Sequence, residues 1–314
     1  MGSIGQNKPP VIDFSEVVGK PRSAEWVTAR EQVRDALIKY GCFEATFDGV
    51  PMDTRKALLG SLKELFDLPL ETKLRNSSDK PFCGYNGPSH RAPLNESIGI
   101  DDADVYNKVD GISMTNWQEG NPEFSRTIHS FSEKLSLLDR IVRRMILESL
   151  GLEKYMEEHL NSTTYALRLM KYNGPQTTDM KMGVCSHTDK NMLTILYQNK
   201  VEGLEVKLKD GDWISIKPKP ECFIAMVGES LYAWTNGRLH CPLHRVMMTG
   251  NDARYSVGLF SNPKAGQMIK APDEMVDDDH PLLFKPFDYN QFIESYASQP
   301  NRDPETSLKA YCGI

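Results

Sequence analysis

The sequence lacks any apolar run long enough to cross a membrane, and its mean hydropathy is −0.46. We therefore expect no membrane-spanning helix. It also lacks an excess of basic residues: the formal net charge is −6 and the isoelectric point is about 5.7. Neither nucleic acid nor an anionic membrane surface attracts such a chain, so the expected partner is a small molecule, bound by a monomer.

A secretory signal and a disulfide framework are also missing. The first residues contain no basic region followed by an apolar stretch, so we expect no export from the cell. The cysteines are scattered, without the spacing of a disulfide framework, at positions 42, 83, 185, 222, 241 and 312. These absences indicate free thiols in a reducing compartment, and we expect a cytoplasmic protein.

The first half of the chain has mainly helical patterns. Ser23 fits the N-cap of a helix that Gly41 ends, and Pro51 fits the start of a second helix. A longer helix is predicted over residues 122–150, where apolar residues recur in steps of four and three. This stripe indicates core packing against a sheet, and it consists of Phe124, Ile128, Phe131, Leu135, Leu138, Val142 and Met145.

The pattern changes to short strands after about residue 162. The strand-like runs lie at 165–172, 192–197, 204–208, 213–216, 222–227, 244–248 and 254–260. Asp210-Gly211 between two of these runs is typical of a hairpin turn. Many short strands at this spacing predict a mainly β fold, a jelly-roll barrel with the early helices packed on its outside.

Two histidines and one aspartate form the most informative pattern in the chain. His187 and Asp189 are two positions apart, so both side chains point to one face of an extended segment, and His244 follows 55 positions later. Two imidazoles and one carboxylate can hold one face of an octahedral metal and leave the opposite face open, as a non-haem Fe(II) oxygenase needs. Arg254 and Ser256, just beyond His244, are suited to hold the far carboxylate of a dicarboxylic co-substrate.

A closed structural zinc site is an alternative for the same region. Its ligands would be two sulfurs and two nitrogens, from Cys185, His187, Cys241 and His244. Such a site leaves Asp189 without a role, and the chain lacks the usual Cys-x-x-Cys knuckle. These two observations favour the iron site over zinc.

A histidine alone is weak evidence for metal binding, because most histidines are structural or surface groups. His129 and His159 lie in charged helical stretches, and we expect both to be solvated. The five histidines other than His187 and His244 lack comparable surroundings.

Ordered motifs accompany the metal pattern along nearly the whole chain. They are Pro-Val-Ile-Asp at 10–13, Tyr-Gly-Cys-Phe at 40–43, Leu-Pro-Leu-Glu-Thr-Lys at 68–73, Leu-Thr-Ile-Leu at 193–196, Asp-Trp-Ile at 212–214 and Asn-Gly-Arg at 236–238. Together with His-x-Asp, the later His and Arg-x-Ser, they resemble the plant-type 2-oxoglutarate/Fe(II)-dependent dioxygenases. The resemblance implies a double-stranded β-helix: a helical region at 1–161 packed on the barrel, a jelly-roll core with the metal site at 162–264, and a C-terminal helical extension at 265–314, as one structural unit.

Three further motifs favour one branch of that family. They are Asn-Glu at 95–96, Trp-x-Glu-Gly-Asn at 117–121 and Arg-x-Met-Lys-Tyr at 168–172. The branch acts on plant specialised metabolites and includes glucosinolate side-chain dioxygenases, lignan ring-closing enzymes and steroidal-alkaloid hydroxylases. The resemblance therefore implies a small plant specialised metabolite as the substrate.

The resemblance also implies a role for each residue of the metal and co-substrate sites. The expected Fe(II) ligands are His187, Asp189 and His244. The expected 2-oxoglutarate contacts are Arg254, Ser256 and Tyr172. Met170 stands where many relatives have an asparagine, so the role of this position toward the co-substrate is left open.

Four residues are candidates for substrate binding. Phe260 matches a substrate-facing aromatic residue of the family, and Arg168 lies on the strand before Tyr172. Tyr85 and Trp117 come from the segment that covers the mouth of the site in relatives. Core packing is the alternative role for Tyr85 and Trp117, and a salt bridge to the scaffold is the alternative for Arg168.

The implied reaction oxidises an unactivated C–H bond. It consumes O2 and 2-oxoglutarate and releases succinate and CO2, with ascorbate as the expected reductant. Hydroxylation is the default outcome, and desaturation or ring closure needs only a different substrate pose. Two alternatives stay open: an iron oxidase on the same scaffold that needs no 2-oxoglutarate, and a jelly-roll binding protein without catalysis.

Overall fold

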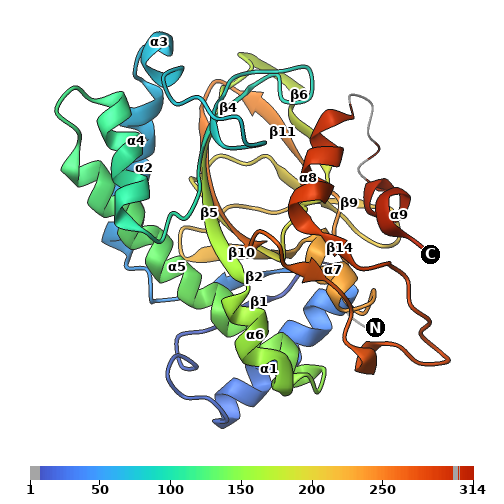
Figure 1. The fold of residues 1–314 in the computed structure, drawn as a ribbon. Helices are drawn as coiled ribbons and strands as arrows, with labels where there is room; N and C mark the ends of the chain where they lie inside the picture. Colours follow the sequence, from blue (N-terminus) through green and yellow to red (C-terminus); the bar gives the residue numbers. More distant parts are fainter. Residues whose placement is uncertain (1–7, 300–302, 304) are drawn as a thin grey trace, which may run out of the picture.

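Two facing β-sheets form the centre of the protein in a computed structural model that describes residues 8–299, 303 and 305–314 (Figure 1). The larger sheet has eight strands in the order β1-β2-β10-β7-β12-β5-β4-β3. Its strands are β1 (Val11–Asp13), β2 (Cys42–Thr46), β10 (Cys222–Val227), β7 (Leu193–Gln198), β12 (Arg254–Pro263), β5 (Thr163–Tyr172), β4 (Asn95–Ile100) and β3 (Gly84–Asn86). All of their pairings are antiparallel except that of β1 with β2.

The smaller sheet has four antiparallel strands in the order β6-β11-β8-β9. They are β6 (Thr177–His187), β11 (His244–Gly250), β8 (Leu204–Lys207) and β9 (Trp213–Ser215). Register shifts interrupt the pairing of β6 with β11, which bends this sheet over the larger one. The two sheets together confirm the predicted jelly roll.

A helical layer covers the outer face of the larger sheet (Figure 1). Its helices are α1 (Ala24–Lys39), α2 (Met52–Phe66), α3 (Leu70–Lys73), α4 (Tyr106–Asn116) and α5 (Pro122–Ser149). The hydroxyl of Ser23 accepts a hydrogen bond from the Trp26 N–H and caps α1 as predicted. The apolar stripe of α5 is buried, so its role is core packing.

Side-chain alternation on β5 separates two apolar cores. Tyr165, Leu167 and Leu169 face the helical layer, whereas Met170 and Tyr172 face the space between the sheets. We call the second group the interior cluster; it contains Cys42, Met170, Tyr172, Leu196, Leu204, Val206, Ile216, Ile224, Met226, Val246 and Met248. The strands therefore direct every second residue of the larger sheet into the barrel.

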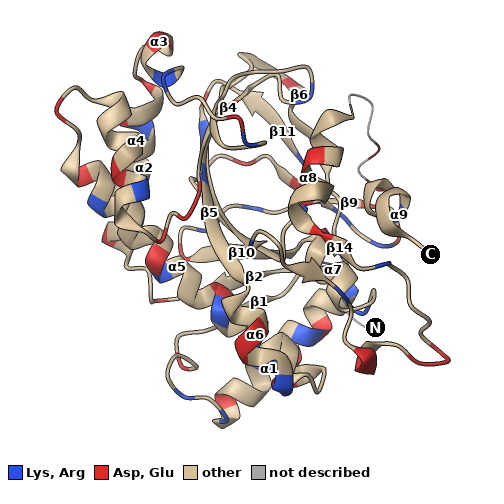
Figure 2. Cartoon of the chain, viewed as in Figure 1, with Lys and Arg blue, Asp and Glu red and all other residues tan. Residues whose placement is uncertain are grey.

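The remaining elements lie around the ends of the barrel. They are η1 (Glu153–Tyr155), α6 (Met156–Asn161), α7 (Glu229–Trp234), β13 (Met268–Ile269), η2 (Asp273–Met275), β14 (Phe287–Asp288), α8 (Tyr289–Ser298) and α9 (Ser307–Cys312). Charged residues gather on the helices and loops, while the strands of the larger sheet carry few (Figure 2). In the described part of the chain, no helix combines the length and the apolar composition needed to cross a bilayer.

The prediction that His159 is solvated is wrong. Its side chain is 4 % exposed, and its ring lies 4.4 Å from that of Trp234 on α7. Burial, together with the positive charge of Arg143, lowers the pKa of His159 well below 6.5. The charged neighbours in sequence lie on the other side of α6, and the fold covers the histidine side.

Candidate metal centre

Two strand ends and one loop bring the predicted metal ligands together. His187 is the last residue of β6, His244 is the first residue of β11, and the two are paired in register. Asp189 follows in the loop before β7. Its Oδ1 lies 3.9 Å from His187 Nε2 and 3.8 Å from His244 Nε2. Among the described residues, His187, Asp189 and His244 form the group of potential metal ligands: one ligand atom from each lies within 4.8 Å of the others.

Neighbouring groups orient each of the three side chains. His187 Nδ1–H donates to the carbonyl of Cys185 at 2.9 Å, and His244 Nδ1–H donates to the carbonyl of Pro242 at 3.2 Å. Both Nε2 atoms are therefore left free of backbone partners and directed at Asp189. The Thr194 hydroxyl donates to Asp189 Oδ2 at 2.6 Å, which leaves Oδ1 toward the histidines.

The electrostatics of the group suit a cation. Burial, reinforced by charge repulsion from His244, lowers the pKa of His187 to about 3, so its imidazole is neutral at physiological pH. Burial acts to raise the pKa of Asp189, but the two histidines, the Thr194 hydroxyl and Lys190 together outweigh it and leave the pKa below its usual value. Two neutral imidazoles and one carboxylate are the protonation states that metal binding requires.

The zinc alternative does not fit this geometry. Neither Cys185 nor Cys241 belongs to the group of clustered ligand atoms in the described ranges. Burial raises the pKa of Cys241 well above 9, so this side chain is a thiol rather than the thiolate that zinc binds. The donor set is therefore two nitrogens and one oxygen.

A buried arginine lies on β12, which pairs with β5 and with β7, the strand that follows the loop of Asp189. Arg254 is 1 % exposed, and on the neighbouring strand it pairs with Tyr172, whose ring centroid is 4.9 Å from the guanidinium. Its Nη1–H donates to Ser256 Oγ at 3.2 Å. Its Nε–H and Nη2–H donate to Gln198 Oε1 at 3.2 and 2.5 Å. All of these acceptors are neutral, and no carboxylate pairs with Arg254 in the described parts of the chain.

This arrangement matches a dicarboxylic co-substrate. A buried cation without an anionic partner is costly, and a ligand carboxylate would compensate its charge. The Nε2 atom of Gln198 is also buried and has no partner within residues 8–299, 303 and 305–314. Tyr172 donates its hydroxyl to Met170 Sδ at 3.5 Å, so the thioether of Met170, which stands where many relatives have an asparagine, packs against Tyr172 beside Arg254.

Of the four candidate substrate residues, two face the interior. Arg168 on β5 and Phe260 on β12 occupy the same alternating positions as Tyr172 and Arg254. Tyr85 pairs with Ile98, a core residue that faces the helical layer, and donates its hydroxyl to Glu96 at 3.1 Å. The structure therefore does not bring Tyr85 to the metal ligands.

Trp117 also lies outside the interior group. It follows α4, and its ring centroid is 5.0 Å from that of Phe124 on α5. Phe124 belongs to the core under the helical layer, and Trp117 packs against that core. The contact is the packing interaction that was the alternative role for this residue.

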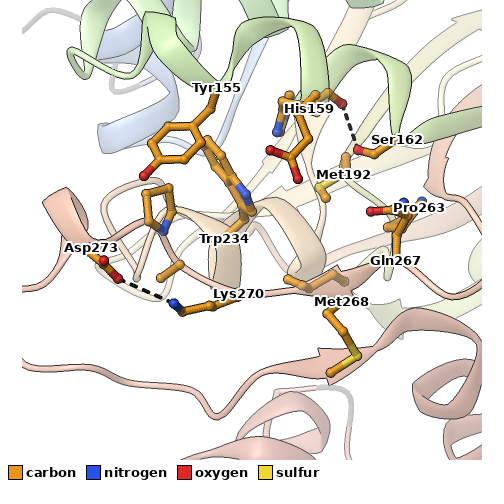
Figure 3. A pocket seen from close by; sticks show the side chains of 14 residues that line it. Tyr155, His159, Ser162, Met192, Trp234, Pro263, Gln267, Met268, Lys270 and Asp273 are labelled. Carbon is orange, nitrogen blue, oxygen red and sulfur yellow. Dashed lines mark hydrogen bonds and ion pairs between the residues drawn. The ribbon is translucent and has the colours of Figure 1, made fainter.

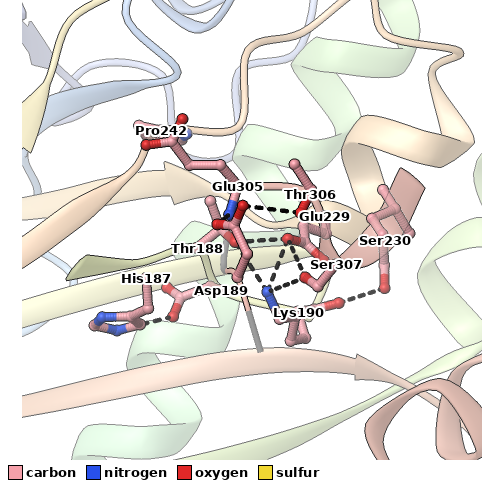
Figure 4. A network of polar contacts seen from close by, with 12 residues as sticks. His187, Thr188, Asp189, Lys190, Glu229, Ser230, Pro242, Glu305, Thr306 and Ser307 are labelled. Carbon is pink, nitrogen blue, oxygen red and sulfur yellow. Dashed lines mark hydrogen bonds and ion pairs between the residues drawn. The ribbon is translucent and has the colours of Figure 1, made fainter. Parts of the chain in front are cut away.

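A polar network supports the loop that carries Asp189 (Figure 4). Glu229 on α7 accepts hydrogen bonds from the Thr188 hydroxyl at 2.6 Å and from Lys190 Nζ at 2.8 Å. Lys190 Nζ also donates to Ser307 Oγ on α9 at 3.2 Å, and the Glu229 N–H donates to the Asp189 carbonyl at 2.8 Å. Sequence reasoning missed this network, since its members are far apart in the chain and match no motif.

A separate cavity of about 210 Å³ opens between η1, α6, α7 and β13 (Figure 3). Its lining includes Tyr155, His159, Trp234 and Lys270, and none of the three predicted metal ligands. The predicted metal ligands therefore lie outside this cavity.

The jelly roll and its histidine–carboxylate group define a class of non-haem iron oxygenases. Residues 163–263 match the 2OG-Fe(II) oxygenase superfamily, and residues 9–123 match the N-terminal region described as "non-haem dioxygenase in morphine synthesis". The chain belongs to the 2OG-Fe(II) oxygenase superfamily, and its reaction depends on 2-oxoglutarate and Fe(II).

The relatives agree with this assignment over the whole length. The chain is 49% identical to a probable 2-oxoglutarate-dependent dioxygenase, AOP1.2, from Arabidopsis thaliana, over 97% of this chain and 96% of that protein. A dioxygenase for auxin oxidation from rice has a similar structure, with 29% identity, a TM-score of 0.83 and coverage of 98% of this chain and 100% of the other. The Arabidopsis thaliana dioxygenase for auxin oxidation 1, in its binary complex with 2-oxoglutarate, gives 27% identity, a TM-score of 0.78 and coverage of 87% and 100%.

Proposed function

We propose that His187, Asp189 and His244 hold one Fe(II) ion and that Arg254 holds the far carboxylate of 2-oxoglutarate beside it. The observations that carry this proposal are the group of two nitrogens and one oxygen and, on a strand of the same barrel, a buried arginine that no carboxylate in the described residues compensates. Two atoms that bind one ion at about 2.0–2.2 Å cannot lie more than about 4.4 Å apart. The distances of 3.8 and 3.9 Å from Asp189 Oδ1 to the two Nε2 atoms lie below this upper limit, and the side chains would close to about 3 Å to share one face of an octahedron.

Each surrounding residue has a defined task in this proposal. When bound, Fe(II) and 2-oxoglutarate supply the oxidising chemistry that consumes O2 and releases succinate and CO2. Thr194 and the backbone carbonyls hold the three ligands in orientation, while Ser256 and Tyr172 complete the carboxylate site. The interior cluster excludes water from this end of the barrel.

The substrate is a small plant metabolite in this proposal, oxidised at an unactivated C–H bond. Phe260 and Arg168 are the residues proposed to contact it, since both face the interior. Hydroxylation is the default outcome, with ascorbate as the reductant. We further propose a cytoplasmic monomer in which residues 1–161, 162–264 and 265–314 form one unit, because β1 to β4 join the sheet of the core.

Anaerobic addition of Fe(II) and 2-oxoglutarate to metal-free protein tests the cofactor roles. We expect the weak visible charge-transfer band of the iron–2-oxoglutarate chelate in the wild type. His187→Ala should abolish the band, and Arg254→Ala should require more 2-oxoglutarate to develop it. Bound iron without a band would favour the oxidase that needs no 2-oxoglutarate, and absence of stoichiometric iron binding would contradict both assignments.

A further inference from the structure

Arg168 occupies an unusual position in the larger sheet. It lies on β5 with its in-register neighbours Gly99 on β4 and Gly258 on β12. The alternation that directs Tyr172 into the barrel directs Arg168 there as well. Arg168 is therefore a long cationic side chain with no side chain beside it on either neighbouring strand.

The two glycines make room for specific neighbours. A Cβ atom at position 99 would lie 2.3 Å from the carbonyl oxygen of Phe82, and one at position 258 would lie 2.7 Å from Cε2 of Phe260. Real side chains do not tolerate such distances, so glycine at both positions lets these groups approach the strand. The result places a backbone carbonyl on one side of Arg168 and an aromatic ring on the other.

The Phe82 carbonyl holds the guanidinium in place. Arg168 Nη2–H donates to this oxygen at 2.8 Å, and the guanidinium carbon lies 5.3 Å from the Phe82 ring centroid. Phe82 has a φ of 67°, a left-handed conformation that is uncommon for a residue other than glycine. Strained backbone of this kind is found most often at functional sites, where it aims a group at its target.

The charge of Arg168 has no anionic partner within ion-pair distance in the described residues. Its contacts are with Phe82, and both are with neutral groups. Burial lowers the pKa of Arg168, while Tyr172, Cys83 and Asp189 partly oppose that effect; an arginine nevertheless stays protonated in proteins. Asp189, the one carboxylate among these opposing groups, is already engaged by the proposed metal site.

We propose that Arg168 binds the carboxylate of the substrate and that Phe260 contacts the apolar body next to it, so that the substrate is a small organic acid. This inference rests on the proposed function, because it assigns Arg254 to 2-oxoglutarate and leaves Arg168 for the second anion. The guanidinium of Arg168 uses one N–H for the Phe82 carbonyl. Its remaining N–H groups and its single positive charge match the two oxygens and the single negative charge of a carboxylate. Glycine at both flanking positions supplies no second cation for a doubly charged group.

Binding of matched acid and amide probes tests the inference. The protein is loaded with Fe(II) and saturating 2-oxoglutarate without O2, and 4-phenylbutanoate, 4-cyclohexylbutanoate and the corresponding amides are titrated calorimetrically. We expect the acid of at least one pair to bind the wild type about 10- to 100-fold more tightly than its amide, as for a charge-assisted hydrogen bond. Arg168→Gln should remove this preference.

Lys171→Gln is the matched control, because it removes a positive charge from the adjacent position of the same strand, on the outer face near Glu96 and Asp67. It should keep the preference for the acid. Arg168→Met provides a second neutral variant, and the charge-transfer band reports whether the site of each variant is intact.

Three results would overturn the inference: equal binding of acid and amide by the wild type, no binding of any probe, or a preference for the acid that survives both neutral variants. A missing band in the wild type would instead contradict the proposed function. A band without a preference for the acid contradicts the carboxylate assignment alone.

Discussion

The charged residues of the interior differ in how completely the protein itself compensates them. Asp189 has two histidines and a threonine hydroxyl around it, whereas Arg254 has neutral oxygen acceptors and the ring of Tyr172. A fixed, planar guanidinium loses little freedom when a carboxylate binds to it. The orientation of Arg254 by Gln198 therefore prepares the proposed co-substrate site before any ligand arrives.

The bidentate binding of a carboxylate by the Arg254 guanidinium can be tested by a substitution that keeps the positive charge. Arg254→Lys should raise the 2-oxoglutarate concentration at half-saturation by roughly 10- to 100-fold, because lysine loses the bidentate geometry. Titration of the charge-transfer band measures this value. Arg245→Lys serves as a control, since Arg245 pairs with Glu205 and stacks on Trp213 instead of contributing to the proposed 2-oxoglutarate site. Equal affinity in wild type and Arg254→Lys would contradict a bidentate role.

His159 should make the stability of the protein depend on pH. Its folded pKa is lowered by burial, so the unfolded chain takes up a proton at this position as the pH falls below about 6.5, and the free energy of unfolding decreases. One such group contributes about 1.4 kcal/mol between about pH 7.5 and about pH 5.5. Urea unfolding of wild type and His159→Phe at both values measures the difference. The same pH dependence in both proteins would contradict the prediction.

The sequence predicts some site residues and not others for physical reasons. His187, Asp189 and His244 follow from donor chemistry and spacing, because a metal restricts both. Thr194 and Gln198 are two polar residues in the mainly apolar strand β7, and only the fold shows that Thr194 contacts Asp189 in the preceding loop and that Gln198 contacts Arg254 on β12. His159 was misjudged since its charged sequence neighbours carry no information on what the fold places over its ring.

At the scale of elements, Gly228, which connects β10 to α7, packs against the loop between Asp189 and β7. The Gly228 N–H donates to the Met192 carbonyl, and a Cβ atom at position 228 would lie 2.1 Å from the carbonyl oxygen of Asn191. The backbone of this loop cannot withdraw without moving Asp189. The packing of two connecting segments therefore fixes one metal ligand.

Two glycine substitutions should have opposite effects. Gly228→Ala should weaken Fe(II) binding and destabilise the fold, because the new methyl group displaces the loop of Asp189. Gly60→Ala should raise the free energy of unfolding by about 0.5–1 kcal/mol, since Gly60 lies within α2 and meets no atom within 4 Å. Anaerobic iron titration and urea unfolding of each variant measure the two effects. Unchanged iron affinity in Gly228→Ala would show that the loop adapts.

The helices were easier to predict than some of the strands. The stripe over residues 122–150 predicts α5, observed at Pro122–Ser149, because a helix shows its buried face in local sequence. β6 was not predicted: Met180, Met182 and Val184 alternate with polar residues or glycine, but the run has few apolar residues and only one of its positions is buried. The network of Lys190, Glu229 and Ser307 joins segments that no local pattern relates.

At the scale of the whole molecule, the cofactors should stabilise the folded state. The proposed ligands come from β6, the following loop and β11, so only the folded chain assembles the site. A ligand at 100 times its Kd adds about 2.7 kcal/mol to the free energy of unfolding. Anaerobic urea unfolding with and without Fe(II) and 2-oxoglutarate measures this gain. His187→Ala should lose the contribution of the metal, and an equal gain in that variant would place the bound metal elsewhere.

The strand order of the larger sheet also determines when its strands can pair during synthesis. β12 pairs with both β5 and β7, so each of these strands keeps an unpaired edge until residues 254–263 leave the ribosome. At about 5–20 residues per second, the chain between the end of β5 and the start of β12 takes about 4–16 seconds to translate. Chaperones have that interval in which to shield the edges of the nascent chain. A ribosome-stalled fragment that ends before β12 would hold the helical layer but neither a closed sheet nor the arginine of the co-substrate site.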